Sequence, residues 1–509
     1  MRVLGLTIFI TMIHWITCLE DREMYSSTDQ LVKLLGVGRE LEQNLTEYIA
    51  AEEAILEKLK KTLLELSAVT ASVDSADGLE EYVSNPLTAY RLVRNMRSRW
   101  SRMEETLGKS PLPEFLALMK LMSEALPTDR DVDGIALGLL RLQDTYQLLP
   151  QSLMGAAGQQ ESSLGPDETF HIAMVAYENQ KFSLYMGWML ETLRQLELGS
   201  LAASLLHMDH LPTTHSFIQQ LLTQGPSEVQ GVLQQMYQAS VQQGLIPELD
   251  HPSMHLLTRT GSFSNAYEAL CRGQGITMPP ERQKRLFCRY SRGGGGVSSL
   301  YAPFKEQDEW DSPRIVRYVD LISDQEIDVI KTLARPKLYR AKVMDHGTGK
   351  KYATETRVSK SGWLADEEDL VIGNLNQKLS AATGLDMTVA ESLQVANYGI
   401  GGQYEPHFDS RLANDTDLVL KGNRIATILI YMSDVRLGGA TVFPDAGAAL
   451  KPQKGSAVVW YNLLRNGKED DRTLHAACPV FIGSKWVANK WVRERGQEFR
   501  RRCSLSPSE

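Results

Sequence analysis

Three shortages in the sequence narrow the classes of protein to which it can belong. Positive charge is scarce, since 54 Lys and Arg residues face 63 Asp and Glu residues and leave a formal net charge of -9. A general nucleic-acid-binding protein needs a basic surface to contact phosphates, so this charge argues against that class. Long apolar runs are missing after the N-terminus, where no segment reaches the roughly 18 residues of a membrane helix. We therefore expect no membrane span in the mature protein.

Cysteine is the third scarce feature, with five residues in a chain of 509. One lies in an apolar leader, and the other four are Cys271, Cys288, Cys478 and Cys503. An even number of cysteines in an oxidising compartment predicts disulfides rather than a metal site. Of the possible pairings we prefer Cys271 with Cys288 and Cys478 with Cys503, because both pairs close short loops.

The leader is typical of a secretory signal peptide. Arg2 supplies a positive charge, residues 3–18 are mostly apolar, and charged residues follow. This pattern predicts a signal peptide over residues 1–18, with an approximate cleavage site. Sequons at Asn44 and Asn414 agree with passage through the secretory pathway. The C-terminus carries no retention signal, so residence in the endoplasmic reticulum would depend on something else.

The length of 509 residues exceeds what one core supports and predicts roughly two to four domains. Residues 21–145 are predicted to form a helical dimerisation domain, with a long helix over residues 29–67 and shorter ones over 89–100 and 113–126. Apolar residues of the long helix alternate spacings of three and four, as in a seam between two helices. That seam could join two chains or pack within its own domain. Its members are Leu45, Ile49, Leu56, Leu59, Leu63 and Leu66.

Residues 146–250 are predicted to form a peptide-binding domain of paired helices. Aromatic residues recur at helical spacing on both sides of a turn at Asn179-Gln180, as in a tetratricopeptide-like (TPR-like) hairpin. Rings on such a hairpin can stack on an extended proline-rich peptide. The candidates are Tyr177, Tyr185 and Trp188, although each could instead fill the core of the hairpin.

A second, less regular hairpin is expected over residues 216–242, and a histidine cluster before it imitates a metal site. The cluster reads His207-Met208-Asp209-His210 and follows a helical segment. On a helix, residues i and i+2 lie on different faces, so this histidine and aspartate would not converge on one ion. We expect no metal there.

The C-terminal part, residues 313–503, is predicted to form a β-rich domain after a linker over residues 251–312 that contains a disulfide. A strand over residues 315–319 precedes a helix that Ser323 caps and that ends near Ala334. Strands separated by glycine turns follow, which favours a double-stranded β-helix (jelly-roll). The fold class is thus multidomain, α plus α/β. The later strands are expected over residues 393–397, 424–433, 440–443, 456–462, 476–481 and 486–491.

One stretch of this domain carries a pattern typical of metal chemistry. His407 and Asp409 follow the strand over residues 393–397 and a glycine-rich turn. In an extended chain residues i and i+2 face the same way, so the imidazole and the carboxylate can bind one ion. With His475 as third ligand they form the set of non-haem Fe(II) oxygenases. Lys485, ten residues later, could neutralise the far carboxylate of a metal-bound 2-oxo acid.

These residues lie in longer motifs that resemble the collagen prolyl 4-hydroxylase α subunits. The resemblance covers nearly the whole chain, because the helical N-terminal half suits the dimerisation and peptide-binding regions of that family. Two motifs, YEALCRG and ERQKRLFCRY, resemble the segment before the catalytic domain. The catalytic motifs are EWDSPRIVRY, TETRVSKSGWL, LQVANYGIGGQYEPHFD, GNRIATILIYMSD, GGATVFP and HAACPV.

The resemblance implies a 2-oxoglutarate dioxygenase acting on procollagen-like chains. It would hydroxylate C4 of proline in X-Pro-Gly repeats with O2, giving 4-hydroxyproline, succinate and CO2. Ascorbate would rescue iron oxidised in uncoupled cycles. By position in the motifs, the Fe(II) ligands of the family fall on His407, Asp409 and His475, and its 2-oxoglutarate contacts fall on Tyr398, Thr441 and Lys485.

The family also implies a partner and a location. Its α subunits form an α2β2 tetramer with protein disulfide isomerase, whose retention signal would hold this chain in the lumen of the endoplasmic reticulum. Two alternatives remain. A lysyl hydroxylase shares the chemistry but would place Arg at the position of Lys485. A non-catalytic collagen-binding subunit would keep the β domain only as a relic.

Overall fold

The structure is a computed structural model of the chain. It describes residues 23–74, 86–108, 110–122, 126–156, 164–198, 262–274, 278–294, 301–344, 351–410 and 420–506. The chain divides into two compact units, of which one contains Gln30–Thr128 and the other contains the chain before and after that range. The signal peptide expected over residues 1–18 lies outside the described residues.

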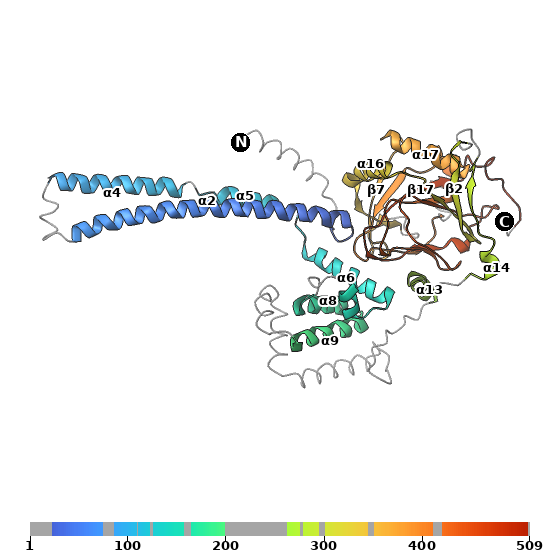
Figure 1. The fold of residues 1–509 in the computed structure, drawn as a ribbon, viewed down its shortest axis with the longest axis horizontal. Coiled ribbons are helices and arrows are strands. Elements are labelled where there is room, and N and C mark those ends of the chain that lie inside the picture. The colour runs from blue at the N-terminus through green and yellow to red at the C-terminus, as the bar shows by residue number, and fades with distance from the viewer. Residues whose placement is uncertain are drawn as a thin grey trace. The chain divides into compact units, whose positions relative to one another are not determined.

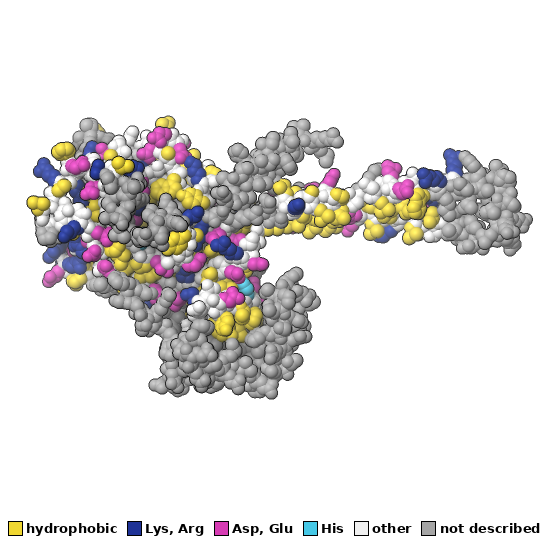
Figure 2. Space-filling view, turned by 180° about the vertical axis from the view of Figure 1, so that it is seen from behind, with side chains coloured by type: hydrophobic (Ala, Val, Ile, Leu, Met, Phe, Trp, Pro, Cys, Tyr) yellow, Lys and Arg dark blue, Asp and Glu magenta, His cyan; other side chains and the backbone are white. Residues whose placement is uncertain are grey.

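The Gln30–Thr128 unit is formed by the helices α2 (Thr28–Asp74), α4 (Pro86–Leu107) and α5 (Leu112–Met122). Figure 1 shows α4 and α5 lying along α2. Tyr48 of α2 stacks on Phe115 of α5, with ring centroids 4.4 Å apart. Much of the predicted seam is solvent-exposed, since Ile49 is 48% and Leu63 is 63% exposed. Hydrophobic side chains accordingly line the surface of this unit in Figure 2.

A second group of helices belongs to the larger unit: α6 (Asp129–Tyr146), α7 (Pro150–Ala156), α8 (Pro166–Glu178) and α9 (Phe182–Leu198). α8 and α9 form the expected hairpin, with Gln180 in its turn at a φ of 59°. α6 packs against α8 and shares its core. The helical region therefore divides near Thr128 rather than at residue 145. Residues 207–210 and 216–242 lie outside the described part of the chain.

The rest of the larger unit is built on antiparallel β-sheets. The strands are β1 (Cys288–Ser291), β2 (Phe304–Asp311), β3 (Arg314–Val319), β4 (Tyr339–Arg340), β5 (Val343–Met344), β6 (Lys351–Tyr352), β7 (Lys360–Leu364), β8 (Leu393–Asn397), β9 (Tyr404–His407), β10 (Arg424–Tyr431), β11 (Leu437–Gly438), β12 (Thr441–Phe443), β13 (Ala448–Leu450), β14 (Ala457–Tyr461), β15 (His475–Ala477), β16 (Val480–Ile482) and β17 (Trp486–Arg493).

Two of the sheets carry the core. One has nine strands in the order β1-β2-β3-β14-β10-β17-β8-β7-β4, and the other has four in the order β13-β12-β15-β9. Along β10 the side chains alternate between faces, so Ile428 and Ile430 join the core under the helices while Leu429 and Tyr431 join the core shared with the four-stranded sheet. The strand expected over residues 476–481 is split into β15 and β16, because Pro479 between them has no N–H to donate to a ladder.

Helices cover the outer face of the large sheet, where α16 (Asp324–Ala334) and α17 (Leu370–Thr383) lie in Figure 1. α16 begins as predicted, since the Ser323 side chain accepts a hydrogen bond from the backbone N–H of Glu326. Shorter helices are α13 (Ser262–Cys271), α14 (Pro280–Gln283), η3 (Arg335–Lys337) and η4 (Asp471–Thr473). Among the described residues, no helix combines the length and the apolarity needed to cross a membrane.

The disulfide of this unit differs from the predicted pairing. Cys271 is bonded to Cys478, with 5.6 Å between their Cα atoms, whereas Cys288 and Cys503 are free and exposed. The preference for short loops was wrong because tertiary packing brings distant segments together. Tyr267 and Leu270 of α13 share a small core with Val442 and Ala476, and this contact places Cys271 beside Cys478.

Candidate active site

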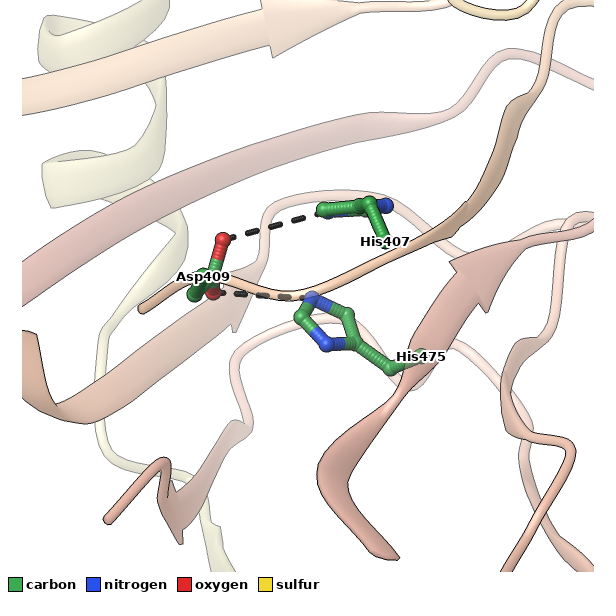
Figure 3. Close-up of side chains that lie close together, drawn as sticks. All are labelled: His407, Asp409 and His475. Atoms are coloured by element: carbon green, nitrogen blue, oxygen red, sulfur yellow. Dashed lines mark ion pairs between the residues drawn. The ribbon is translucent and has the colours of Figure 1, made fainter. Parts of the chain in front are cut away.

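Antiparallel pairing of two strands brings the predicted metal ligands together. His407 at the end of β9 lies directly opposite His475 at the start of β15. Asp409 follows two residues after His407, and Figure 3 shows its carboxylate facing both imidazoles. Nε2 of His407 lies 3.8 Å from Oδ1 of Asp409, and Nε2 of His475 lies 3.5 Å from Oδ2. One ligand atom from each residue fits within 4.8 Å of the others.

Backbone carbonyls fix the orientation of both imidazoles. Nδ1 of His407 lies 2.8 Å from the carbonyl oxygen of Glu405, and Nδ1 of His475 lies 3.0 Å from that of Thr473. A carbonyl only accepts, so each Nδ1 must carry the proton and donate it. Each Nε2 then presents its lone pair toward Asp409, which is the tautomer that a metal ion requires.

The protonation states of His407 and Asp409 favour the binding of a cation. Burial, together with the neighbouring His475, lowers the pKa of His407 to about 3. Burial alone would raise the pKa of the Asp409 carboxyl, but His475 and His407 hold it down at about 2. At neutral pH the site therefore offers a neutral imidazole and an ionised carboxylate, which are the forms that bind metals.

A chain of hydrogen-bonded polar side chains, beginning with Thr427 of β10, supports the carboxylate of Asp409. The Thr427 hydroxyl donates to Oδ2 of Asp409 over 2.7 Å and accepts from Nδ2 of Asn462 over 2.9 Å. Both side chains are buried. Neither residue was predicted from the sequence, although a lone threonine inside the apolar run of residues 425–432 is a signal for an inward-facing polar group. Thr427 points inward because it alternates with Ile428 along the strand.

Lys485 is buried inside the same domain. Its side chain is 1% exposed, and no carboxylate of the described residues forms an ion pair with it. Burial lowers the pKa of its ammonium group to about 7. The ammonium nitrogen lies 5.0 Å from the ring centre of Tyr398, and burial raises the pKa of that phenol to about 12. A buried cation without a partner is costly, so this position suits an anionic ligand.

Thr441 lies on the inner face of the four-stranded sheet. It is 3% exposed, and its hydroxyl accepts a hydrogen bond of 2.7 Å from the phenol of Tyr431. Because a hydroxyl can donate one hydrogen bond and accept others, Thr441 keeps a donor for a ligand. Its role as a 2-oxoglutarate contact stays a prediction from the resemblance.

The predicted peptide contacts are placed differently from one another. Trp188 has no exposed surface and donates to Oε1 of Gln143 over 2.7 Å, so it is a core residue and the prediction of a direct peptide contact is corrected. Tyr185 is buried beside Tyr177, with ring centroids 5.4 Å apart. Tyr177 is 49% exposed and stays a predicted contact.

The two sequons remain predictions as well. Asn44 lies within α2, where its side-chain amide donates to the carbonyl oxygen of Glu40 over 2.7 Å. Asn414 lies outside the described residues.

The sheets and the metal-ligating cluster define a class of oxygenase. Residues 393–493 match the 2OG-Fe(II) oxygenase superfamily, and this range contains every predicted metal and cosubstrate residue. The chain is thus a 2-oxoglutarate-dependent dioxygenase that uses Fe(II). Residues 27–157 match the N-terminal region of the prolyl 4-hydroxylase alpha-subunit.

Curated relatives extend the similarity over almost the whole chain. Prolyl 4-hydroxylase subunit alpha-2 of Gallus gallus is 41% identical over 95% of this chain and 95% of its own. Prolyl 4-hydroxylase subunit alpha-1 of Homo sapiens is 39% identical over 95% of this chain and 96% of its own. A solved viral collagen prolyl hydroxylase from Paramecium Bursaria Chlorella virus-1 is 26% identical, with a TM-score of 0.29, covering 35% of this chain and 95% of that one. This chain belongs to the prolyl 4-hydroxylase α-subunit family.

Proposed function

We propose that this chain is the catalytic subunit of a procollagen-proline 4-dioxygenase. It would hydroxylate C4 of proline in X-Pro-Gly repeats with O2 and 2-oxoglutarate, giving 4-hydroxyproline, succinate and CO2. The observation that carries the proposal is the combination of His407, Asp409 and His475 with a buried Lys485 that forms no ion pair with a carboxylate of the described residues. These side chains satisfy the two chemical demands of the reaction, which are a metal with open coordination positions and a chelating dicarboxylate.

The residues fit both groups. Two neutral imidazoles and an ionised carboxylate are the donor set that Fe(II) takes in oxygenases of this class. When bound, the iron and the chelated 2-oxo acid supply the activation of O2. His407 and His475 would bind through Nε2, because Nδ1 of each donates to the backbone. Lys485 would pair with the distal carboxylate of 2-oxoglutarate, and Tyr398 and Thr441 would donate to it. Ascorbate would keep the iron reduced.

The aromatic and apolar surfaces support a collagen-like substrate and an assembly. We take α8 and α9 as one TPR-like hairpin and the two β-sheets as a jelly-roll, so that the hairpin binds a proline-rich chain and the β domain modifies it. Tyr177 offers an exposed ring on which polyproline can stack. The exposed apolar residues of α2 suit a contact with a second copy.

The assembly also bears on location. We propose an α2β2 tetramer with protein disulfide isomerase in the lumen of the endoplasmic reticulum. The signal peptide expected over residues 1–18 supports passage through the secretory pathway. In this assembly the isomerase subunit would supply the retention signal.

The test is product analysis with a defined peptide. The purified enzyme is incubated with a Pro-Pro-Gly repeat peptide, Fe(II), 2-oxoglutarate and ascorbate, and 4-hydroxyproline and succinate are quantified. We expect the two products in equal amounts. Hydroxylation of lysine in a Lys-containing repeat, with none of proline, would indicate a lysyl hydroxylase. Peptide binding without any succinate release would indicate a non-catalytic collagen-binding subunit.

A further inference from the structure

The described chain begins with a short segment that packs at the end of β8, next to the residues that precede β17. This segment, Glu23–Asp29, belongs to the same compact unit as the sheets. Its last three residues converge on the side-chain oxygen of Asn397 at the end of β8. The Ser27 hydroxyl donates over 2.6 Å, the Thr28 hydroxyl over 3.2 Å and the backbone N–H of Asp29 over 3.1 Å. Asn397 has no exposed surface, so these three hydrogen bonds lie in the interior of the protein.

The other side of the Asn397 amide reaches Ser484 and Lys485, the two residues before β17. Its Nδ2 donates to the carbonyl oxygen of Lys485 and to the hydroxyl of Ser484, each over 3.3 Å. The Ser484 hydroxyl is also 2.6 Å from that of Thr28. The same Lys485 carbonyl accepts from the backbone N–H of Tyr398 over 3.1 Å. Asn397 thus links the backbone at Tyr398 to the backbone at Lys485 through hydrogen bonds.

The side chain of Asn397 does not face the cosubstrate groups. Along β8 it alternates with Ala396, and it shares the outer face of the sheet with Val395. Tyr398 and Ala396 belong to the inner core. Any effect of Asn397 on 2-oxoglutarate therefore passes through the backbone of Tyr398 and Lys485, which makes it a positioning residue.

Gly399 shows how closely the segment approaches. A Cβ atom at this position would lie 2.0 Å from the carbonyl oxygen of Tyr25 and 2.9 Å from the backbone nitrogen of Ser27. The φ of Gly399 is not positive, so an alanine would fit its backbone conformation. The three atoms nearest to that Cβ position all belong to the segment, so the segment explains why glycine is needed here. The added methyl group of Gly399→Ala should therefore push the segment away from the glycine-rich turn that follows β8.

Ion pairs hold both ends of the segment. Oε2 of Glu23 lies 2.7 Å from Nε of Arg340, and both side chains are buried. Oδ1 of Asp29 lies 2.9 Å from Nε of Arg335 at the end of α16. The Glu23–Arg340 pair is buried on both sides, so removing one partner would leave an unpaired buried charge. The segment is therefore anchored to the β domain at Glu23, and the more exposed Asp29–Arg335 pair adds a second contact.

We propose that Glu23–Asp29 is a positioning part of the 2-oxoglutarate site, acting through Asn397 on Tyr398 and Lys485. The inference rests on the proposed function, because it assigns the segment to the cosubstrate of that reaction.

The experiment measures cosubstrate binding directly. Full-length enzyme, as purified with its partner subunit, is loaded with Fe(II) without O2 and titrated with 2-oxoglutarate, and the visible charge-transfer absorption reports binding. The variants are Ser27→Ala combined with Thr28→Val, and Gly399→Ala. Thr332→Val is the matched control, because the Thr332 hydroxyl donates to a backbone carbonyl of α16 on the surface. Thr28→Ser, which keeps the hydroxyl, is the conservative variant.

Loss of the hydroxyl donors should weaken 2-oxoglutarate binding about fivefold, and Gly399→Ala at least as much, with Fe(II) affinity and kcat at saturating 2-oxoglutarate within about twofold. Thr28→Ser and Thr332→Val should bind like wild type. If both test variants lower the unfolding temperature but bind 2-oxoglutarate like wild type, the segment is merely structural and the proposal is wrong. If the wild-type enzyme itself does not bind 2-oxoglutarate, the proposed function fails first. The Lys485→Ala variant separates these outcomes, because it should lose binding whenever the proposed function holds.

Discussion

The metal centre and the α8 and α9 hairpin both rely on buried side chains, but those side chains contact different things. In the centre, polar groups converge on one point, and each is held from behind by a backbone carbonyl or a hydroxyl. In the hairpin, Trp188 and Tyr185 pack into a helical core, while Tyr177 keeps about half of its surface exposed. The metal centre therefore functions in one geometry only. The hairpin instead combines a packed core with an exposed surface.

This difference predicts how a single substitution should affect function and stability in each region. A converging site loses its function when one member is removed, because the remaining ligands cannot move together to replace it. A packed core loses stability in proportion to the volume removed, and its surface loses binding gradually.

Removal of the carboxylate ligand should have the largest effect. Asp409→Ala leaves two imidazoles without a charge to compensate the metal, so hydroxylation should fall by more than about 100-fold. Circular dichroism and the unfolding temperature should change little, since Asp409 lies beyond the end of β9 and makes no ladder hydrogen bond. Asp328→Ala, an exposed aspartate of α16, is the control. An Asp409→Ala enzyme with more than a tenth of wild-type succinate release would remove the contrast.

Removal of the buried cation comes next. Lys485→Ala leaves the distal carboxylate of 2-oxoglutarate buried without a partner, and its affinity should fall by more than about 100-fold. The Fe(II) affinity should stay within about threefold, because Lys485 is not a ligand. Calorimetric titration with each of the two ligands measures both quantities. Equal losses for metal and cosubstrate would mean that Lys485 supports the fold of the centre as a whole.

The support behind the carboxylate should matter less than the carboxylate itself. Thr427→Val removes the hydroxyl that donates to Asp409 over 2.7 Å and nearly keeps the side-chain shape. Fe(II) affinity should fall by about 10- to 100-fold, and Thr427→Ser should restore most of it. A Thr427→Val enzyme with unchanged Fe(II) affinity would show that the polar chain through Asn462 serves folding alone.

The pH dependence of cosubstrate binding offers a finer test. Burial lowers the pKa of Lys485 to about 7 in the free enzyme. Only the protonated ammonium attracts the carboxylate, so 2-oxoglutarate affinity should be constant below that pH. Above it, affinity should fall by roughly tenfold per pH unit, as the protonated fraction does. Lys485→Arg keeps its charge over this range and should flatten the profile. A wild-type profile that is flat to pH 9 would contradict the placement of Lys485.

The sequence allowed more to be predicted in the centre than in the hairpin, for a physical reason. His407, Asp409 and His475 are polar residues in apolar surroundings, and strand alternation fixes which way they point. The strand at residues 393–397 and the cap at Ser323 are local features and were predicted correctly. Disulfide pairing depends on which distant segments pack together, so Cys271 with Cys478 could not be found from loop length. Trp188 and Tyr177 both belong to a pattern of aromatic residues at helical spacing. Only the tertiary structure shows which ring is buried in the core and which is exposed.

The smallest effect should come from the exposed ring, and it completes the contrast. Tyr177→Ala removes an aromatic face that is 49% exposed, so affinity for a proline-rich peptide should fall about threefold to tenfold with little change in unfolding temperature. Trp188→Ala should act in the opposite way, since it leaves a cavity and an unpaired Gln143, and should cost about 3–5 kcal/mol of stability in the helical core. Peptide titration and thermal unfolding of both variants separate the two roles, with Tyr177→Phe as the control that keeps the ring. If Tyr177→Ala destabilised the protein as much as Trp188→Ala, both rings would belong to the core, and the peptide would have to bind elsewhere on this domain.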